Sequence, residues 1–451
     1  MKRRDFLSNT ALIGAGIPLG ISPVALSSCS GQPTAKFYTP EELGMFSFEK
    51  VAPEGKPLKA ALIGCGSRGT GAALQFLAAG KELSIIALGD VFADRLDSCR
   101  KMLKEHQNNE VPDANCFIGF DAFKKILDMN EVELVLLCTP TFFRPEHFKA
   151  AVDAGKHVFM EKPCAVDPIG IRTVIAASKS ATAKGLTVVT GTHKRHRRDY
   201  WEAFLKVRNG LIGDLVYATA HGHQGAMWFK NRRPEWNDME YCIRNWFNIY
   251  WLSGGLFIDQ TIHNIDVATW FLGRTPAKAV GFGGRAQRKI GDTYDFMAVD
   301  YHYDNGTRML ATGRQIDGCD GNFSEQIYGS EGVALLTDSS ENVMIKDYEG
   351  NILWQYDYKA MPVKNPYEQE HVHLVESIRL NKKINQAEAL AYSCQIAILG
   401  CEAAFSGKVL TWEEMMSSSL KYGPEKAEFG ALPDYHEGIV PIPGSVPKAT
   451  E

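Results

Sequence analysis

Short apolar runs separated by stretches with helical periodicity mark the first half of the folded chain. Runs with the length of buried strands are Leu58–Ile63, Leu83–Leu88, Val132–Cys138, His157–Met160 and Thr187–Thr190. Helical segments lie between them, for example near residues 120–130. Near-continuous apolar strands that alternate with helices predict an α/β fold with a doubly wound parallel sheet. We assign residues 58–191 to this Rossmann-type domain.

The pattern changes after Gly191 to longer strand-like runs that follow one another directly. These runs are Phe296–Tyr303, Met309–Thr312 and Val333–Thr337. Turn signals such as Asp304-Asn305-Gly306 separate them, which predicts a large, mostly antiparallel sheet. Helices are expected near 368–381 and 386–406. We therefore assign residues 192–420 to a C-terminal α+β domain, followed by a tail over 421–451 that contains proline and glycine.

The N-terminus has the pattern of an export signal. Three basic residues precede a glycine-rich apolar run that two prolines interrupt, which argues against a permanent membrane span. Arg3–Leu7 looks like a twin-arginine signal, which exports folded proteins, and Leu26–Cys29 resembles a lipoprotein processing site. We expect a signal over 1–29, a linker over 30–57, and a periplasmic protein that meets a membrane only through a lipid on Cys29.

Composition excludes several classes of partner. The 451 residues carry a formal net charge of −4, so no global field favours nucleic acid or an anionic membrane surface. The ten cysteines are scattered singly without a CxxC pair. This spacing argues against a disulfide framework and against a metal site, and we expect no metal.

A glycine-rich turn directly follows the first strand. Gly64-Cys65-Gly66-Ser67-Arg68-Gly69 has the GxGxxG spacing, which lets a backbone approach the pyrophosphate of a dinucleotide at a helix N-terminus. Asp90 ends the second strand, where a carboxylate accepts hydrogen bonds from the adenosine ribose. The carboxylate would repel a 2′-phosphate, so NAD is favoured over NADP, although Arg68 and Arg95 could soften that preference.

A lysine stands where another parallel strand ends. Glu161-Lys162-Pro163 follows the strand that ends at Met160, at the sheet edge where ligands bind in such folds. A lysine partly desolvated beside a cationic nicotinamide could exchange a proton with a substrate hydroxyl. Thr139-Pro140 ends a further strand at the same edge, and His147 follows on the next helix.

Two carboxylates flank a histidine in the second domain. Asp259 and His263 are four residues apart and share a face if the segment is helical, with Asp266 three residues further on nearly the same side. A carboxylate so placed could orient or polarise the imidazole for catalysis. The alternative is a structural histidine in a packed helix.

These motifs together resemble the glucose–fructose oxidoreductase and inositol dehydrogenase family, Gfo/Idh/MocA. The resemblance covers roughly residues 58–408 and implies oligomers built through the large sheet, as dimers or tetramers. It also implies a catalytic role for Lys162 with Asp259 and His263 at the reacting hydroxyl, and substrate contacts from Lys194 and Arg195. The expected cofactor-binding residues are Gly64, Gly66, Ser67, Arg68, Gly69, Asp90, Thr139, Pro140, His147, Glu161 and Lys162.

The substrate class follows from the resemblance and from a segment dense in aromatic residues. Residues 221–251 contain several tryptophans, tyrosines and arginines, among them Arg244 and Trp246, which could bind the faces and hydroxyls of a sugar. A packed lid or subunit interface is the alternative interpretation of this segment. We expect a small-molecule sugar or polyol as substrate.

Three functions stay open at this point. The first is an NAD(P)-dependent dehydrogenase of a sugar or polyol hydroxyl, and the second is a redox-neutral glycosidase that uses NAD catalytically. The third is a non-catalytic NAD-binding protein, against which Lys162 and His263 argue. Export favours a tightly held cofactor, because free NAD is scarce outside the cytoplasm.

Overall fold

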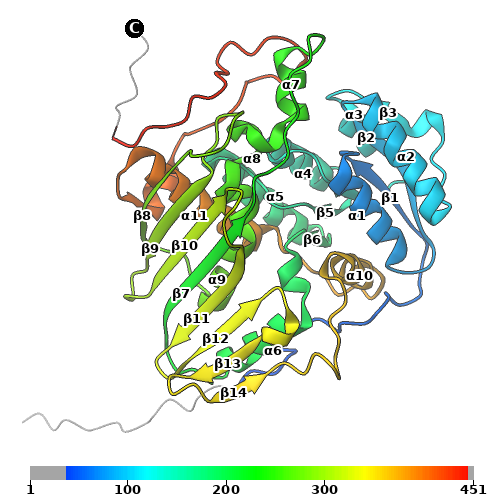
Figure 1. Cartoon of the computed structure of the whole chain (residues 1–451). Coiled ribbons are helices and arrows are strands. Elements are labelled where there is room, and N and C mark those ends of the chain that lie inside the picture. The colour runs from blue at the N-terminus through cyan, green and yellow to red at the C-terminus, as the bar shows by residue number, and fades with distance from the viewer. Residues whose placement is uncertain (1–36, 445–451) are drawn as a thin grey trace, which may run out of the picture. The chain divides into compact units, whose positions relative to one another are not determined.

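The computed structural model describes residues 37–444 (Figure 1). The export signal expected over residues 1–29, with Cys29, lies outside the described residues, as do the first part of the expected linker and the last residues of the tail. The nine cysteines within the described chain are free thiols.

The first sheet has six parallel strands in the order β3-β2-β1-β4-β5-β6, so the predicted doubly wound sheet is confirmed. Its strands are β1 (Leu58–Ile63), β2 (Leu83–Asp90), β3 (Cys116–Ile118), β4 (Leu134–Leu137), β5 (His157–Met160) and β6 (Val188–Thr190). Strand β3 was not predicted, because its two half-buried residues and the exposed Ile118 are too few to show a period.

Helices cover both faces of this sheet, and the strands are apolar for that reason. Alternate strand residues such as Leu62 pack under α1 (Ser67–Ala78), α2 (Ala93–Gln107) and α10 (Pro366–Arg379). Their neighbours, such as Ile63, pack under α3 (Ala122–Leu127), α4 (Arg144–Asp153) and α5 (Pro168–Ala183). Loops, and not helices, form the edge of the sheet at the carboxyl ends of its strands, where ligands bind in such folds.

The second sheet has nine strands in the order β14-β13-β12-β11-β7-β10-β9-β8-β15. The strands are β7 (Leu215–Gln224), β8 (Lys278–Gly284), β9 (Phe296–His302), β10 (Arg308–Gln315), β11 (Asn322–Gly329), β12 (Gly332–Thr337), β13 (Met344–Asp347), β14 (Ile352–Gln355) and β15 (Leu410–Thr411). All neighbouring pairs are antiparallel except β7 and β10, which are parallel. The prediction of a mostly antiparallel sheet is confirmed.

One face of the second sheet lies on helices, as the yellow-green strands in front of the green and orange helices in Figure 1 show. The helices are α6 (Arg198–Arg208), α9 (Ile262–Leu272) and α11 (Ala387–Ser406). Residues that face the helices, such as Ala311, are fully buried, whereas Phe282 on β8, next to the edge strand β15, is 67% exposed. Buried and more exposed side chains therefore alternate along the strands of this sheet.

The helix α11 is, among the described helices, the one long and apolar enough to cross a membrane. Most of its residues are buried in the core between β8 and α5, for example Cys394 and Ile398. Its apolar composition therefore reflects contacts on several sides inside the protein.

The segments outside the two sheets pack on the folded body. Phe46, in the part of the chain assigned to a linker, stacks on His373 of α10 with ring centroids 4.0 Å apart, and Ala52 is buried. In the tail, the Tyr422 amide donates to Asp167 at 3.1 Å. The polar and glycine-rich composition that suggested tethers thus belongs, over the described residues, to ordered chain that covers the two domains.

Candidate active site

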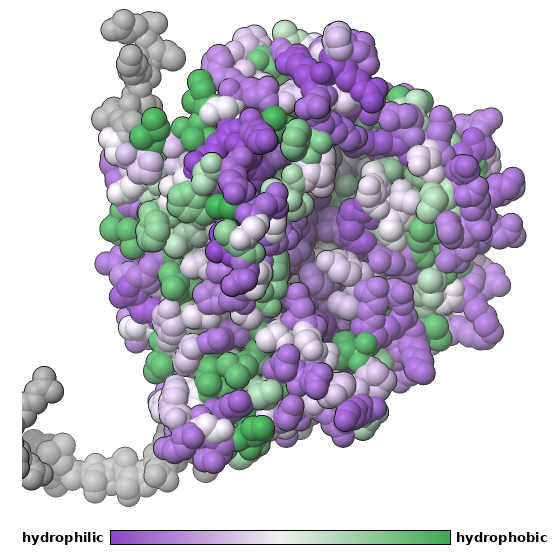
Figure 2. Space-filling model, in the orientation of Figure 1, coloured by the Kyte–Doolittle hydropathy of each residue, from purple (hydrophilic) through white to green (hydrophobic). Residues whose placement is uncertain are grey.

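A cleft lined by the glycine loop opens at the carboxyl ends of the parallel strands. It has a volume of about 960 Å³ and is bounded by loops after β1, β2, β3 and β4. The second domain completes it with Trp228, Lys230, Ile243 and Trp246. Figure 2 shows a deep hollow between polar rims on this side of the molecule.

The glycine loop has the space that a dinucleotide requires. A Cβ on Gly64, whose φ is +99°, would lie 2.7 Å from the Cys138 carbonyl carbon, and one on Gly69 would lie 1.8 Å from the Gly64 oxygen. A Cβ on Gly66 would meet nothing closer than Arg95 Nη1 at 4.0 Å. Gly64 and Gly69 therefore form the turn, while Gly66 and Ser67 open α1 towards the cleft, which fits a bound diphosphate.

Asp90 lies at the cleft, at the end of β2. Its carboxylate accepts hydrogen bonds from the backbone amides of Cys65 at 2.7 Å and Phe92 at 2.9 Å. Burial raises the pKa of this carboxyl above its ordinary value, and the two amides oppose the rise. The carboxylate joins the glycine loop to the second strand and retains lone pairs for ribose hydroxyls.

The predicted cofactor residues of the next two strands also surround the cleft. Thr139 Oγ1 and His147 Nδ1 are 3.3 Å apart, and both residues line the cleft with Pro140. Burial and the nearby Arg144 lower the pKa of His147 to about 3. The imidazole is therefore neutral and packs between Phe123 and other apolar side chains.

Arg68 is committed to buried carboxylates. Its guanidinium donates to Glu161 and lies 2.7 Å from Glu370 Oε1 on α10. Glu161 is 3% exposed. Among the described residues, these ion pairs engage Nε and Nη2 of Arg68, and Nη1 donates to Gln75, so Arg68 holds α10 to the first domain and is a poor ligand for a 2′-phosphate.

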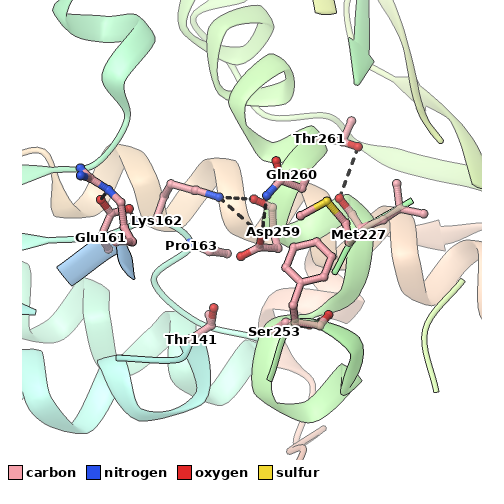
Figure 3. Close-up of polar contacts among 12 residues, drawn as sticks. Thr141, Glu161, Lys162, Pro163, Met227, Ser253, Asp259, Gln260 and Thr261 are labelled. Carbon is pink, nitrogen blue, oxygen red and sulfur yellow. Dashed lines mark hydrogen bonds and ion pairs between the residues drawn. The ribbon is translucent and has the colours of Figure 1, made fainter. Parts of the chain in front are cut away.

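Lys162 meets Asp259 across the domain boundary (Figure 3). The lysine follows β5, and Asp259 lies in η5 (Phe257–Thr261), a π-helical turn before α9. The two charges are 3.6 Å apart, the Lys162 ammonium also donates to the Asp259 carbonyl, and the aspartate is 2% exposed. A π-helical turn is a frequent device for displacing a functional side chain from a regular helix.

His263 lies beside this ion pair and is neutral. A small cavity is lined by Lys162, His263 and Lys194, among other residues. Burial and the positive charge of Lys162 hold the pKa of His263 well below its ordinary value. A neutral imidazole next to a lysine can accept a hydrogen bond or a proton from a hydroxyl.

The expectation that Asp259 or Asp266 orients the imidazole of His263 is wrong. Asp266 accepts two hydrogen bonds from Arg195, at 2.7 and 3.0 Å, and one from Ser393 at 2.8 Å. Asp259 faces Lys162 and not the imidazole. Within residues 37–444, therefore, neither carboxylate is hydrogen-bonded to His263, because the π-helical turn and the arginine direct them elsewhere.

The ring of His193 contacts His263, and the sequence analysis did not single this residue out. The centroids are 4.5 Å apart, and His193 stacks on Tyr367 of α10 at 4.3 Å. Burial and Lys194 lower the pKa of His193 well below its ordinary value. Its position after β6, next to the predicted Lys194 and Arg195, was the only signal in the sequence.

The predicted substrate residues divide into two groups. Lys194 borders the small cavity and is ion-paired with buried Glu325 at 2.8 Å, while Arg195 is held by Asp266. Trp246 lines the dinucleotide cleft instead. Arg244 pairs with Asp94 at 3.1 Å beside that cleft. The structure thus places Trp246 in the dinucleotide cleft and Arg244 next to it, and neither residue lines the small cavity at Lys162.

Comparisons with known proteins extend over both domains. A model described as "Oxidoreductase family, NAD-binding Rossmann fold" (GFO_IDH_MocA) matches residues 58–191. A model described as "GFO/IDH/MocA C-terminal domain" matches residues 200–335. Together they account for more than half of the chain.

Individual relatives are distant. D-glucoside 3-dehydrogenase of Escherichia coli is 26% identical over 247 residues, which cover 54% of this chain and 61% of that protein. A glycosyl hydrolase family 109 protein of Shewanella pealeana is 24% identical over 320 residues, 69% of this chain and 67% of its own length. The structure of scyllo-inositol dehydrogenase from Lactobacillus casei, with NAD(H) and scyllo-inositol, has a TM-score of 0.60 and 21% identity over 79% of this chain and 99% of its own. With the glycine cleft, both family domains and the shared fold, this chain belongs to the Gfo/Idh/MocA family of NAD-binding oxidoreductases.

Proposed function

We propose that this oxidoreductase oxidises a secondary hydroxyl of a sugar, polyol or glycoside beside Lys162. The observation that carries the proposal is the meeting of Lys162, Asp259 and a neutral His263 at the carboxyl end of β5. Bound NAD would supply the hydride acceptor. The residues of the chain then have to orient the hydroxyl and remove its proton.

The charges around the cavity favour a division of these two tasks between Lys162 and His263. Lys162, fixed by Asp259, is a hydrogen-bond donor to the hydroxyl oxygen and stabilises negative charge that develops there. The neutral imidazole of His263 accepts the hydroxyl proton. General base assistance of this kind contributes roughly 10²–10⁴-fold to a rate.

Relatives support the choice of a carbohydrate as substrate. One is named a D-glucoside 3-dehydrogenase, and this chain spans 61% of its length. The cavity itself offers charged and imidazole groups, which suit a polyhydroxylated molecule with hydrogen-bond donors and acceptors on several carbons.

The test is a panel of free sugars, polyols and glycosides, with NADH formation followed by absorbance. Lys162→Met is expected to lower kcat/KM by about 10²-fold or more. Lys149→Met is the matched control, because Lys149 is 60% exposed and paired with Asp153 on the same helix. Equal activity of Lys162→Met and wild type on every accepted substrate would contradict the proposal.

A redox-neutral glycosidase is the second candidate, favoured by the match to the family 109 glycosyl hydrolase over 69% of the chain. In that case the sugar would be oxidised transiently, the aglycone eliminated, and the product reduced again. Aryl glycosides distinguish the two: aglycone release without net NADH indicates the glycosidase, and stoichiometric NADH indicates the dehydrogenase.

A further inference from the structure

The dinucleotide cleft is closed by side chains that belong to neither the Rossmann domain nor the catalytic cavity. Trp228, Lys230 and Trp246 come from the segment between β7 and α8 (Tyr250–Ser253), yet they line the same cleft as Gly66 and Asp90. We call residues 228–246 the clamp segment. It contains α7 (Asp238–Arg244), and it shares the lining of this cleft with the glycine loop.

Two cations in this cleft have no carboxylate partner. Arg95 on α2 points to the glycine loop, since its Nη1 is 4.0 Å from where a Cβ on Gly66 would be. Lys230 of the clamp segment lines the cleft from the other side. Within the described chain, no carboxylate oxygen lies within ion-pair distance of either residue, although most buried or clustered cations elsewhere are paired. A diphosphate over the N-terminus of α1 would complement both charges.

A latch fixes the clamp segment to the first domain. Arg244 donates to both oxygens of Asp94 at 3.1 Å and lies over the Phe92 ring at 3.9 Å from its centroid. Glu240, one turn earlier on α7, accepts from Arg244 Nε at 2.9 Å. Phe92 and Asp94 lie two and four residues after Asp90, so the latch closes beside the end of the cleft that would hold the adenosine ribose.

The C-terminal tail secures the latch from outside. The Met239 amide donates to the Gly430 carbonyl at 3.1 Å, and the Leu432 amide donates to Asp238 at 3.0 Å. Phe429 packs against the rings of Phe92 and Phe120, with centroids 5.8 and 5.0 Å away. In Figure 1, α7 lies beside the red tail. The tail lies beyond the residues that the family models match.

We infer that the clamp segment and the tail form the second half of the dinucleotide site and keep NAD bound through successive turnovers. Lys230 and Arg95 hold the diphosphate between them, and NAD leaves only when the Arg244–Asp94 latch opens. The inference rests on NAD binding by the Rossmann domain and not on the identity of the substrate.

The test measures exchange of the nucleotide and needs no substrate. Purified full-length protein loaded with NAD is mixed with excess isotopically labelled NAD, and the retained nucleotide is identified by mass spectrometry after removal of free ligand. We expect slow exchange in the wild type and exchange about tenfold faster in Arg244→Gln, because an ion pair and a cation–π contact are lost. Lys230→Gln is expected to speed exchange and to reduce its dependence on salt concentration.

Arg233→Gln is the matched control. Arg233 is in the same segment but is 66% exposed, with its nearest carboxylate 3.9 Å away on Glu235. Phe429→Ala removes the outer ring of the tail and tests the latch if Arg244→Gln does not fold. Exchange in the wild type as fast as in Arg244→Gln, or wild-type rates in Arg244→Gln, Lys230→Gln and Phe429→Ala alike, would overturn the inference. Slow exchange without activity on any sugar would support it and count only against the proposed function.

Discussion

Two glycines of the nucleotide loop, Gly66 and Gly69, are expected to respond differently to substitution by alanine. Gly66→Ala adds a methyl group where the nearest atom is Arg95 Nη1 at 4.0 Å, and Gly66 already has φ −68°. The fold therefore tolerates the change. The methyl group enters the space in front of the first amides of α1, which is the space we assign to the diphosphate.

The size of the effect follows from the hydrogen bonds at stake. Loss of one hydrogen bond to a charged group costs about 1.5–3 kcal/mol, which is about 10- to 150-fold in Kd. We expect Gly66→Ala to weaken NAD binding by this factor with the thermal midpoint unchanged. Gly69→Ala, whose methyl would lie 1.8 Å from the Gly64 oxygen, is expected to lower the thermal midpoint as well.

Titration calorimetry with NAD and differential scanning calorimetry of the unliganded proteins measure the two effects separately. Wild-type affinity in Gly66→Ala would refute the placement of the diphosphate. A large loss of thermal stability in Gly66→Ala would refute the argument that the space in front of this glycine is open.

Three further expectations concern other parts of the molecule. Burial lowers the pKa values of His147 and His196 to about 3, whereas both imidazoles have a pKa of about 6.5 in the unfolded chain. Unfolding therefore takes up protons below pH 6.5, and the free energy of unfolding falls as the pH is lowered. Each histidine should lower the free energy of unfolding, measured in urea, by about 1.4 kcal/mol at pH 5.5. An unfolding free energy that does not change between pH 7.5 and 5.5 would contradict this. Asp259→Asn leaves the Lys162 ammonium without its carboxylate and should lower kcat more than tenfold with NAD affinity unchanged, as stopped-flow and calorimetry would report. Phe282, which is 67% exposed on the second sheet, tests the oligomer that the family resemblance implies. Phe282→Asp should lower the molar mass measured by light scattering, and an unchanged mass would exclude this face as the interface.

Local patterns were sufficient for the first domain and its nucleotide loop. The bounds predicted for β1 and β5 are those observed, and Gly64, Gly66, Asp90 and Lys162 lie where strand ends placed them. This success has a physical reason. A parallel strand covered on both faces must be apolar throughout, and a tight turn before a helix requires glycine, so both features are written in adjacent residues.

Ion pairs between residues far apart in the chain could not be predicted from the sequence. Spacing suggested that Asp266 would flank His263, but Arg195, 71 residues earlier, binds this carboxylate. Composition suggested a substrate role for Arg244, which pairs with Asp94 at a separation of 150 residues.

The sequence by itself therefore determined the two-domain architecture, the nucleotide loop and the lysine beside it. The tertiary structure alone decided which charges form ion pairs, that His193 lies beside His263, and that the tail packs on α7 next to the nucleotide cleft. Hydrophobic periodicity predicts which side of a helix or strand faces the core, because neighbouring residues share one backbone geometry. It does not predict which residue lies across that core, because that depends on packing between segments far apart in the chain.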